Sequence, residues 1–320
     1  MPIWSRGFSL VELLFAMALT VLLLMLMLTA FTALQAFSNQ TRQLAFLQQN
    51  GQLVLNLLHN ELQNTGFWGG LSQQQIRDAI STKAAPVNDC FETGLDSGSF
   101  PAADKPFIGL FAATASGTRQ LGCLTNLMPA SEFLQVKRAV GIRLRKGEMR
   151  NNRFYLQLDW QQGRFVDLTT ALNDADLIFP YQHLVLYVQP QQLNGHTIPV
   201  LMRKRLVRTT AGLASISTDS VIDGVERLHF EFLIDSNFDG LPNYSLATQQ
   251  MTNAHWLQQD SQIVAIQYHV LLRTLEPDRR YKNHQQYQLG HISFMAPGDH
   301  FRRLALSGTF YFDNAALASK

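Results

Sequence analysis

The chain has 320 residues, enough for one large domain or two small ones, and its formal net charge is +2. Charged residues make up only 16% of the sequence, below the usual share of about 25%, so much of its polarity comes from Gln and Asn. A net charge this small does not by itself imply a nucleic-acid or acidic partner.

The first predicted element is an apolar helix near the N-terminus. Residues 13–34 form a run of 22 residues without a charged side chain, long enough to cross a bilayer of about 30 Å. Glu12 stands at the edge of this run, where a lipid-facing carboxylate costs roughly 2.5–3.5 kcal/mol. In an ordinary secretory signal the small residue of the cleavage site follows the apolar stretch, whereas Gly7 precedes it here. Cleavage after Gly7 would therefore leave the membrane helix on the mature protein.

The letters GFSLVE at residues 7–12 resemble the prepilin signal of type IV pilins and type II secretion pseudopilins. The resemblance implies that prepilin peptidase cuts after Gly7 and that the new first residue, Phe8, is N-methylated. It also implies that the Glu12 carboxylate meets the N-terminal amine of a neighbouring subunit, or its own, inside the filament core. A buried carboxylate is tolerable when a cation and hydrogen bonds compensate it. The alternative for Glu12 is an acid at the lipid headgroups of a simple anchor.

The helix is expected to continue beyond the apolar run. Apolar residues and one glycine recur three or four positions apart, as on one helix face: Leu44, Leu47, Gly51, Val54, Leu58 and Leu62. A helix from about residue 8 to 65 would be roughly 85 Å long, and glycines near residues 66–70 predict its end. A coiled coil is the alternative for this stripe.

These features divide the chain into three predicted parts. Residues 1–7 are the leader peptide, and residues 8–66 are the long helix, which spans the membrane over about residues 8–34. Residues 67–320 form a periplasmic α+β domain.

The globular part is expected to contain a mainly antiparallel sheet. Residues 84–118 are rich in Ala, Pro, Gly, Ser and Asp, which predicts a long connection. Several later segments alternate polar and apolar residues, as half-buried strands do: 133–140, 153–160, 183–189, 198–208, 225–234, 263–274 and 304–312. We therefore expect a pilin-like α+β fold, in which a long N-terminal helix packs on a mainly antiparallel β-sheet domain.

Cys90 and Cys123 are the only cysteines. They lie beyond the apolar segment and outside the cytoplasm if that segment is an anchor, so we expect a disulfide between them. Closing a loop of about 34 residues should stabilise the fold by roughly 3–4 kcal/mol. Two unrelated buried thiols are the alternative, and no CxxC pair suggests zinc.

The order of the later segments resembles the PilW family of minor pilins across almost the whole chain. The segments are LQNTGFWGG, FLQVKRA, HLVLYVQ with LMRKRL, DGVERLHFEF, DSNFDGLPN, VAIQYHVLLRT and FRRLALSGTFYFDN. The resemblance implies a structural minor pilin, single-pass in the inner membrane with a periplasmic C-terminal domain. Its partners would be other minor pilins, the major pilin and an adhesin-like tip protein, in a complex that primes or caps a type IV pilus. The alternatives are a type II secretion minor pseudopilin and a membrane-anchored periplasmic module that binds DNA or mediates adhesion.

One loop has part of a calcium-binding pattern. Asp235, Asn237 and Asp239 alternate before a glycine, and Asn243 occupies the ninth position. The twelfth position is Leu246 in place of the bidentate Glu, and the flanks read as strands, so the loop is not an EF-hand. It could hold Ca²⁺ weakly with backbone carbonyls and water. The alternative is a polar turn whose side chains cap their own backbone.

Two basic segments, residues 143–153 and 203–208, could present positive stripes to DNA or phospholipid. Acids spread through the rest of the chain favour an ordinary solvated sheet face, which argues against a nucleic-acid partner. The chain has no HExxH, GxSxG, P-loop or GxGxxG motif. We therefore expect a protein that is not an enzyme.

Overall fold

The computed structural model describes residues 9–72, 75–76, 80–81, 83–103, 105–116, 119–159, 162–173, 175–193 and 195–313. The chain divides into two compact units, Met1–Phe46 and Leu47–Lys320. Helix α1 (Leu10–Leu62) begins in the first unit and ends in the second. The second unit contains sheets whose strand pairs are antiparallel except for the pair β1 and β5, so the predicted α+β class is confirmed.

Helix α1 has 53 residues and no proline. Its large apolar side chains are exposed in the first unit, as a helix made for an apolar environment requires. In the second unit a stripe of residues three and four apart is buried: Leu47, Gly51, Val54, Leu58 and Leu62. Asn64 and Gly66 then adopt positive φ values of 60° and 77°, a backbone conformation that ends a helix.

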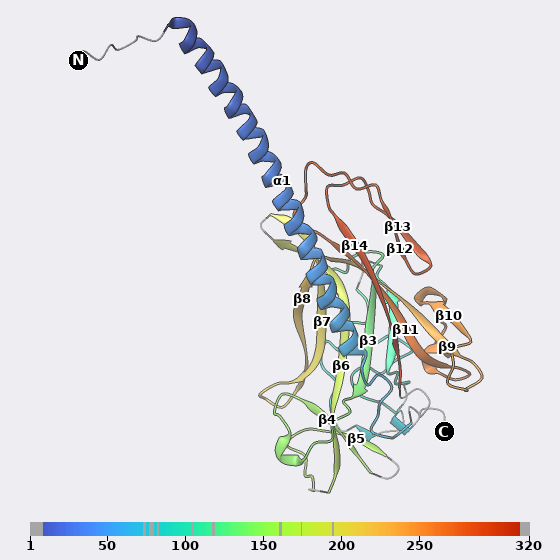
Figure 1. Cartoon of the computed structure of the whole chain (residues 1–320). Coiled ribbons are helices and arrows are strands. Elements are labelled where there is room, and N and C mark those ends of the chain that lie inside the picture. The colour runs from blue at the N-terminus through green and yellow to red at the C-terminus, as the bar shows by residue number, and fades with distance from the viewer. Residues whose placement is uncertain are drawn as a thin grey trace. The chain divides into compact units, whose positions relative to one another are not determined.

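The larger sheet has eight strands, and β6 is its longest at 17 residues. Its main path runs β1 (Ile80–Ser81), β5 (Gly163–Val166), β4 (Phe154–Leu158), β6 (Leu177–Leu193), β3 (Glu132–Ala139) and β2 (Leu110–Thr114). Strand β7 (His196–Arg208) pairs with β6, and β8 (Ala214–Asp223) pairs with β7. One edge of β6 pairs with β3, while the other pairs first with β4 and then with β7. Figure 1 shows β6 running from β4 to β7.

The smaller sheet has the order β10 (Tyr244–Ala247), β9 (Val225–Asp235), β11 (Gln262–Arg273) and β14 (Arg303–Tyr311). A hairpin of β12 (Gln286–Leu289) and β13 (Ile292–Met295) lies beside β14 (Figure 1). Short helical segments also occur at η1 (Lys146–Glu148), η2 (Thr248–Gln250) and α3 (Asn253–Leu257). Strand β9 contacts β3, β6 and β7, which joins the two sheets through one core.

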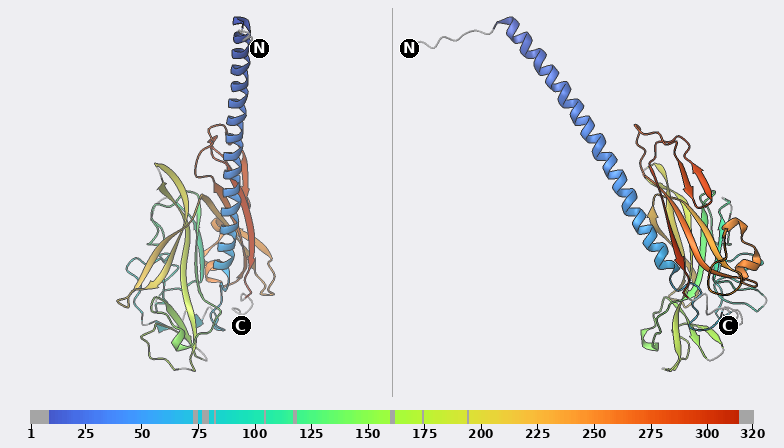
Figure 2. Two further views of the ribbon diagram at one scale, coloured as in Figure 1. Left: turned by 60° about the vertical axis from the view of Figure 1, so that its left-hand side comes forward. Right: turned by 45° about the vertical axis from the view of Figure 1, so that its right-hand side comes forward.

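The part of α1 in the second unit packs against β14. Gly51 lies so close to Leu306 that a Cβ at position 51 would collide with the leucine side chain. About two turns further along the helix, the His59 ring meets the Phe310 ring edge-on, with 5.0 Å between centroids. The left view of Figure 2 shows the end of the helix between the strands of the larger sheet and β14, drawn in red. The small residue at position 51 therefore permits close helix-to-strand contact.

Candidate functional site

The first turn of α1 is closed by a capping box. The Glu12 N–H donates to Ser9 Oγ at 3.2 Å, and the Ser9 N–H donates to Glu12 Oε2 at 2.9 Å. The two bonds satisfy backbone donors that the start of a helix leaves unpaired. A carboxylate in the first turn also interacts favourably with the helix dipole. Glu12 therefore has a local structural role in the single chain, while Gly7 and Phe8 lie outside the described residues.

The N-terminal part of α1 is long and apolar enough to cross a membrane, judged by length and composition. Hydroxyl side chains along it return their hydrogen bonds to the helix itself: the Thr20 hydroxyl donates to the Met17 carbonyl at 2.8 Å, and the Thr29 hydroxyl to that of Leu26 at 2.8 Å. Such local bonds let a hydroxyl lie in hydrocarbon without an unpaired donor. The segment is thus suited to serve as a membrane anchor.

The C-terminal end of α1 is held by two arginines of the larger sheet. Arg138 of β3 donates to the backbone carbonyls of Glu61 and Gln63, the last at 2.6 Å. The Glu61 carboxylate lies 3.1 Å from the Arg138 guanidinium and 2.7 Å from that of Arg203 on β7. Cations at a helix C-terminus pair with its free carbonyls and its dipole. These contacts fix the end of the helix to both β3 and β7.

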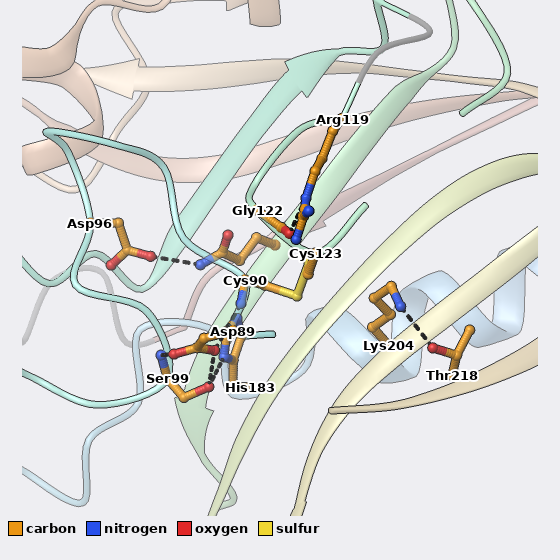
Figure 3. The surroundings of a disulfide bond; sticks show 11 residues. Asp89, Cys90, Asp96, Ser99, Arg119, Gly122, Cys123, His183, Lys204 and Thr218 are labelled. Carbon is orange, nitrogen blue, oxygen red and sulfur yellow. Dashed lines mark hydrogen bonds between the residues drawn. A yellow bond between two sulfur atoms is a disulfide. The ribbon is translucent and has the colours of Figure 1, made fainter. Parts of the chain in front are cut away.

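Cys90 and Cys123 form the expected disulfide. Beside it, the Asp89 carboxylate accepts hydrogen bonds from the Ser99 N–H at 2.7 Å and the Ser99 hydroxyl at 2.5 Å (Figure 3). The Ser99 oxygen also lies 2.9 Å from His183 Nδ1. The Ser99 hydroxyl can donate to Asp89 while it accepts a hydrogen bond from the Nδ1–H tautomer of His183. All three side chains are buried, and their contacts join the loop to β6.

A fully buried ion pair lies in the same region. The Lys137 ammonium is 2.6 Å from both carboxylate oxygens of Asp96, and neither side chain is exposed. The Gln135 amide donates to the same carboxylate at 2.9 Å, and the ammonium lies 4.4 Å from the centre of the Phe107 ring. Burial lowers the pKa of Lys137 and the Asp96 charge opposes that shift. The pair ties the long loop to β3.

The loop proposed to bind Ca²⁺ forms a turn that is stabilised by its own side chains. The buried Asp235 carboxylate accepts three hydrogen bonds from backbone N–H groups of the loop, at 2.7–3.0 Å. The Asn243 oxygen accepts from the Ser236 N–H at 2.7 Å, and the Asn237 amide donates to Asp239 at 2.9 Å. This geometry is what the polar-turn alternative requires. Calcium binding stays a prediction, which isothermal titration of the chain with Ca²⁺ tests.

The basic segment at residues 203–208 is balanced by acids. Arg205 lies 2.7 Å from Asp219 on the neighbouring strand, and Arg208 lies 3.1 Å from Asp167. Together with the contact between Arg203 and Glu61, these ion pairs reduce the positive field that DNA would need.

The structure also brings together a group of histidines and glutamates that sequence reasoning missed: Glu132, His229, Glu231, His269 and His291. His229 and Glu231 stand two residues apart on β9 and so point to the same face of the sheet. This two-residue spacing of His229 and Glu231 was the signal in the sequence that could have indicated the cluster. Burial lowers the pKa of the His269 ring. Burial opposes ionisation of Glu231, but hydrogen bonds from His291 outweigh it and hold the pKa of that carboxyl below its usual range.

Comparison with known proteins adds a family match. Residues 185–314 match the family model PilW, described as Type IV Pilus-assembly protein W. The matched region runs from within β6 to just past the end of β14 and includes the whole of the smaller sheet. Neither a curated protein nor a solved structure matches the chain.

Proposed function

We propose that the chain, whose residues 185–314 match the PilW model of type IV pilus-assembly proteins, is a structural minor pilin that helps to initiate or cap a type IV pilus. The observation that carries this proposal is the family match over residues 185–314, in a chain whose N-terminal helix is apolar enough for a membrane. The PilW family is structural, and the buried Asp89, Ser99 and His183 cluster has no free nucleophile, which supports the same conclusion.

Maturation is proposed to follow the prepilin pattern. Prepilin peptidase removes residues 1–7 by cutting after Gly7, and Phe8 becomes the N-methylated first residue. Mass spectrometry of the chain purified from membranes should find methylated Phe8 at the N-terminus. The Gly7→Ala variant should retain residues 1–7. A wild-type chain that still begins at Met1 would contradict this step.

Glu12 is proposed to bind the N-terminal amine of a neighbouring subunit during assembly, and the capping box supplies a matched pair of variants. Glu12→Gln keeps an oxygen that can accept the Ser9 N–H, but it removes the negative charge. Ser9→Ala removes the serine half of the capping box and keeps the charge. We expect Glu12→Gln to be cleaved yet absent from sheared pili, and Ser9→Ala to be incorporated. Pili that contain both variants equally would show that the charge is not needed.

The proposed location is the inner membrane, crossed once over about residues 8–34, with residues 67–320 in the periplasm. Protease added to spheroplasts should degrade the globular part and leave a membrane-protected N-terminal fragment. The proposed partners are other minor pilins, the major pilin and an adhesin-like tip protein. Crosslinking in membranes before pilus assembly should capture the minor pilins first, since a priming complex forms before the filament grows.

A type II secretion minor pseudopilin remains the alternative, because the GFSLVE signal and the apolar helix suit either filament. A deletion strain separates the two functions. Loss of surface pili with normal protein secretion supports the pilus, whereas loss of secretion with normal pili supports the pseudopilin. A role as an anchored DNA-binding or adhesive module is less well supported, because Arg205 and Arg208 are already paired with acids.

A further inference from the structure

The polar face of the smaller sheet brings metal-binding side chains together from three elements. His229 and Glu231 come from β9, and His269 of β11 lies opposite His229 in the strand register. His291 comes from the turn between β12 and β13. Donor atoms of His229, Glu231 and His291 all lie within 4.8 Å of one another. The fold therefore assembles nitrogen and oxygen donors that are far apart in the sequence.

His229 is oriented as a metal-binding histidine is. Its Nδ1 lies 2.8 Å from Glu132 Oε1, and the two side chains are 2% and 3% exposed. Its other ring nitrogen, Nε2, is buried without a hydrogen-bond partner and lies 3.6 Å from Glu231 Oε1. A carboxylate behind one ring nitrogen fixes the tautomer and aims the other nitrogen at the metal. Buried polar atoms are normally hydrogen-bonded, so this unpaired nitrogen is available to bind a ligand.

Glu132 is itself held in place. Its second carboxylate oxygen accepts hydrogen bonds from the Phe230 N–H and the Thr248 hydroxyl, each at 2.7 Å. Strand β10 pairs with β9 only as far as Glu231, so Glu132 and Thr248 take over at the strand edge beyond it. The carboxylate that orients His229 is therefore fixed by the backbone of β9.

The hairpin turn closes over the cluster because residue 290 is a glycine. Gly290 has a φ of 61°, and a Cβ there would collide with Glu231 Oε1 and lie 2.9 Å from His269 Nε2. Its approach places His291 Nδ1 2.8 Å from Glu231 Oε1. His269 Nε2 is a second buried ring nitrogen without a hydrogen-bond partner. Two unpaired ring nitrogens thus lie close to one carboxylate under this turn.

We propose that His229, Glu231 and His291 bind a Zn²⁺ ion, with His269 or water as the fourth ligand. Imidazole and carboxylate donors in this number suit Zn²⁺, whereas Ca²⁺ and Mg²⁺ prefer oxygen donors alone. Tetrahedral zinc with bonds of about 2.0–2.2 Å separates its ligand atoms by about 3.3 Å, close to the 3.6 Å between His229 and Glu231. The ion would replace the proton shared by His291 and Glu231 and fasten the hairpin to β9 and β11. This structural role is separate from the proposed part in pilus assembly.

The test uses the full chain in detergent, without a histidine tag and after treatment with a chelator. Isothermal titration should find one Zn²⁺ bound per chain, and Co²⁺ should give the visible absorption of a tetrahedral nitrogen and oxygen site. His291→Ala is the main variant, because its side chain is 50% exposed and its removal spares the core. We expect it to weaken Zn²⁺ binding at least about tenfold, and Glu132→Gln to weaken it by roughly 10–100-fold.

His196→Ala is the matched control, since His196 is exposed on β7, in the larger sheet. It should bind Zn²⁺ as the wild-type chain does. Equal affinity in His291→Ala, or no binding by a chain whose circular dichroism shows it folded, would overturn the proposal and leave a hydrogen-bonded cluster. Because binding is measured on the purified chain, the result does not depend on whether the protein enters a pilus.

Discussion

Lys137 and Asp96 are both fully buried, so each depends on the other for compensation of its charge. Asp96→Asn leaves the ammonium in the interior without a carboxylate, and such a loss usually costs about 3–5 kcal/mol. We expect that decrease in the free energy of unfolding in urea at neutral pH. The double variant Asp96→Asn with Lys137→Met removes both charges and should recover part of the stability. A double variant that loses the sum of the two single effects would show that the pair is not coupled.

Asp167 predicts a dependence of stability on pH. Burial raises the pKa of this carboxyl, but hydrogen bonds from Thr169, Lys83 and Arg208 outweigh it and hold the pKa well below its usual value. The ionised form is therefore favoured in the folded chain, and its contribution is present above the unfolded pKa of about 3.9. Asp167→Asn should lower the free energy of unfolding at pH 7 by about 1.5–3 kcal/mol.

Measuring stability at several pH values tests this role of Asp167. As the pH falls below about 4, the Asp167 carboxyl of the unfolded chain takes up a proton while the folded carboxylate is still ionised, so the advantage over asparagine should shrink. Urea denaturation of both chains between pH 7 and pH 3 measures the difference. If the difference in free energy of unfolding between the wild-type chain and Asp167→Asn stays constant or widens on acidification, these contacts do not depend on the charged form of Asp167.

At the level of elements, the contact between α1 and β14 depends on the lack of a side chain at Gly51. Gly51→Leu would push into Leu306, and overpacking of this kind costs typically about 1–3 kcal/mol. The neighbouring Gln52 is exposed on the same helix, so Gln52→Leu is the matched control. We expect a lower melting temperature for Gly51→Leu only. Equal melting temperatures would mean that the helix is free to move away from β14.

The strands that could be predicted from the sequence are those rich in apolar residues, including β3, in which every residue is buried. Strands β9, β11 and β14 alternate polar and apolar residues and appear where the pattern placed them. Strand β8 was missed because it pairs only with β7 and is built from small polar residues, with little apolar surface to bury. Strand β6 is longer than predicted. It includes Pro180 and Pro190, residues that normally argue against a strand interior, and both lie outside the stretch that pairs with β3.

At the level of the whole molecule, local motifs and spatial clusters differ in what a sequence can reveal. The Ser9 and Glu12 capping box and the disulfide depend on nearby letters or on the only two cysteines. The His229 cluster depends on strand register and on a hairpin turn that covers β9. His229 and His269 are far apart in the sequence and come together only because β9 pairs with β11. Sequence reasoning therefore recovered the fold class but not this candidate metal site.

The disulfide should matter to the stability of the whole second unit. Residues 83–131 form little regular structure beyond β2 among the described positions, so Cys90 and Cys123 limit how far this loop can spread when the chain unfolds. Replacing both by serine should lower the free energy of unfolding by roughly 3–4 kcal/mol, measured in urea on the full chain in detergent. Wild-type chain treated with reductant should show the same loss, and the serine variant should not respond to reductant. If reduction leaves the wild-type midpoint unchanged, the buried contacts of Asp89 with Ser99 and of Asp96 with Lys137 are enough to hold the loop.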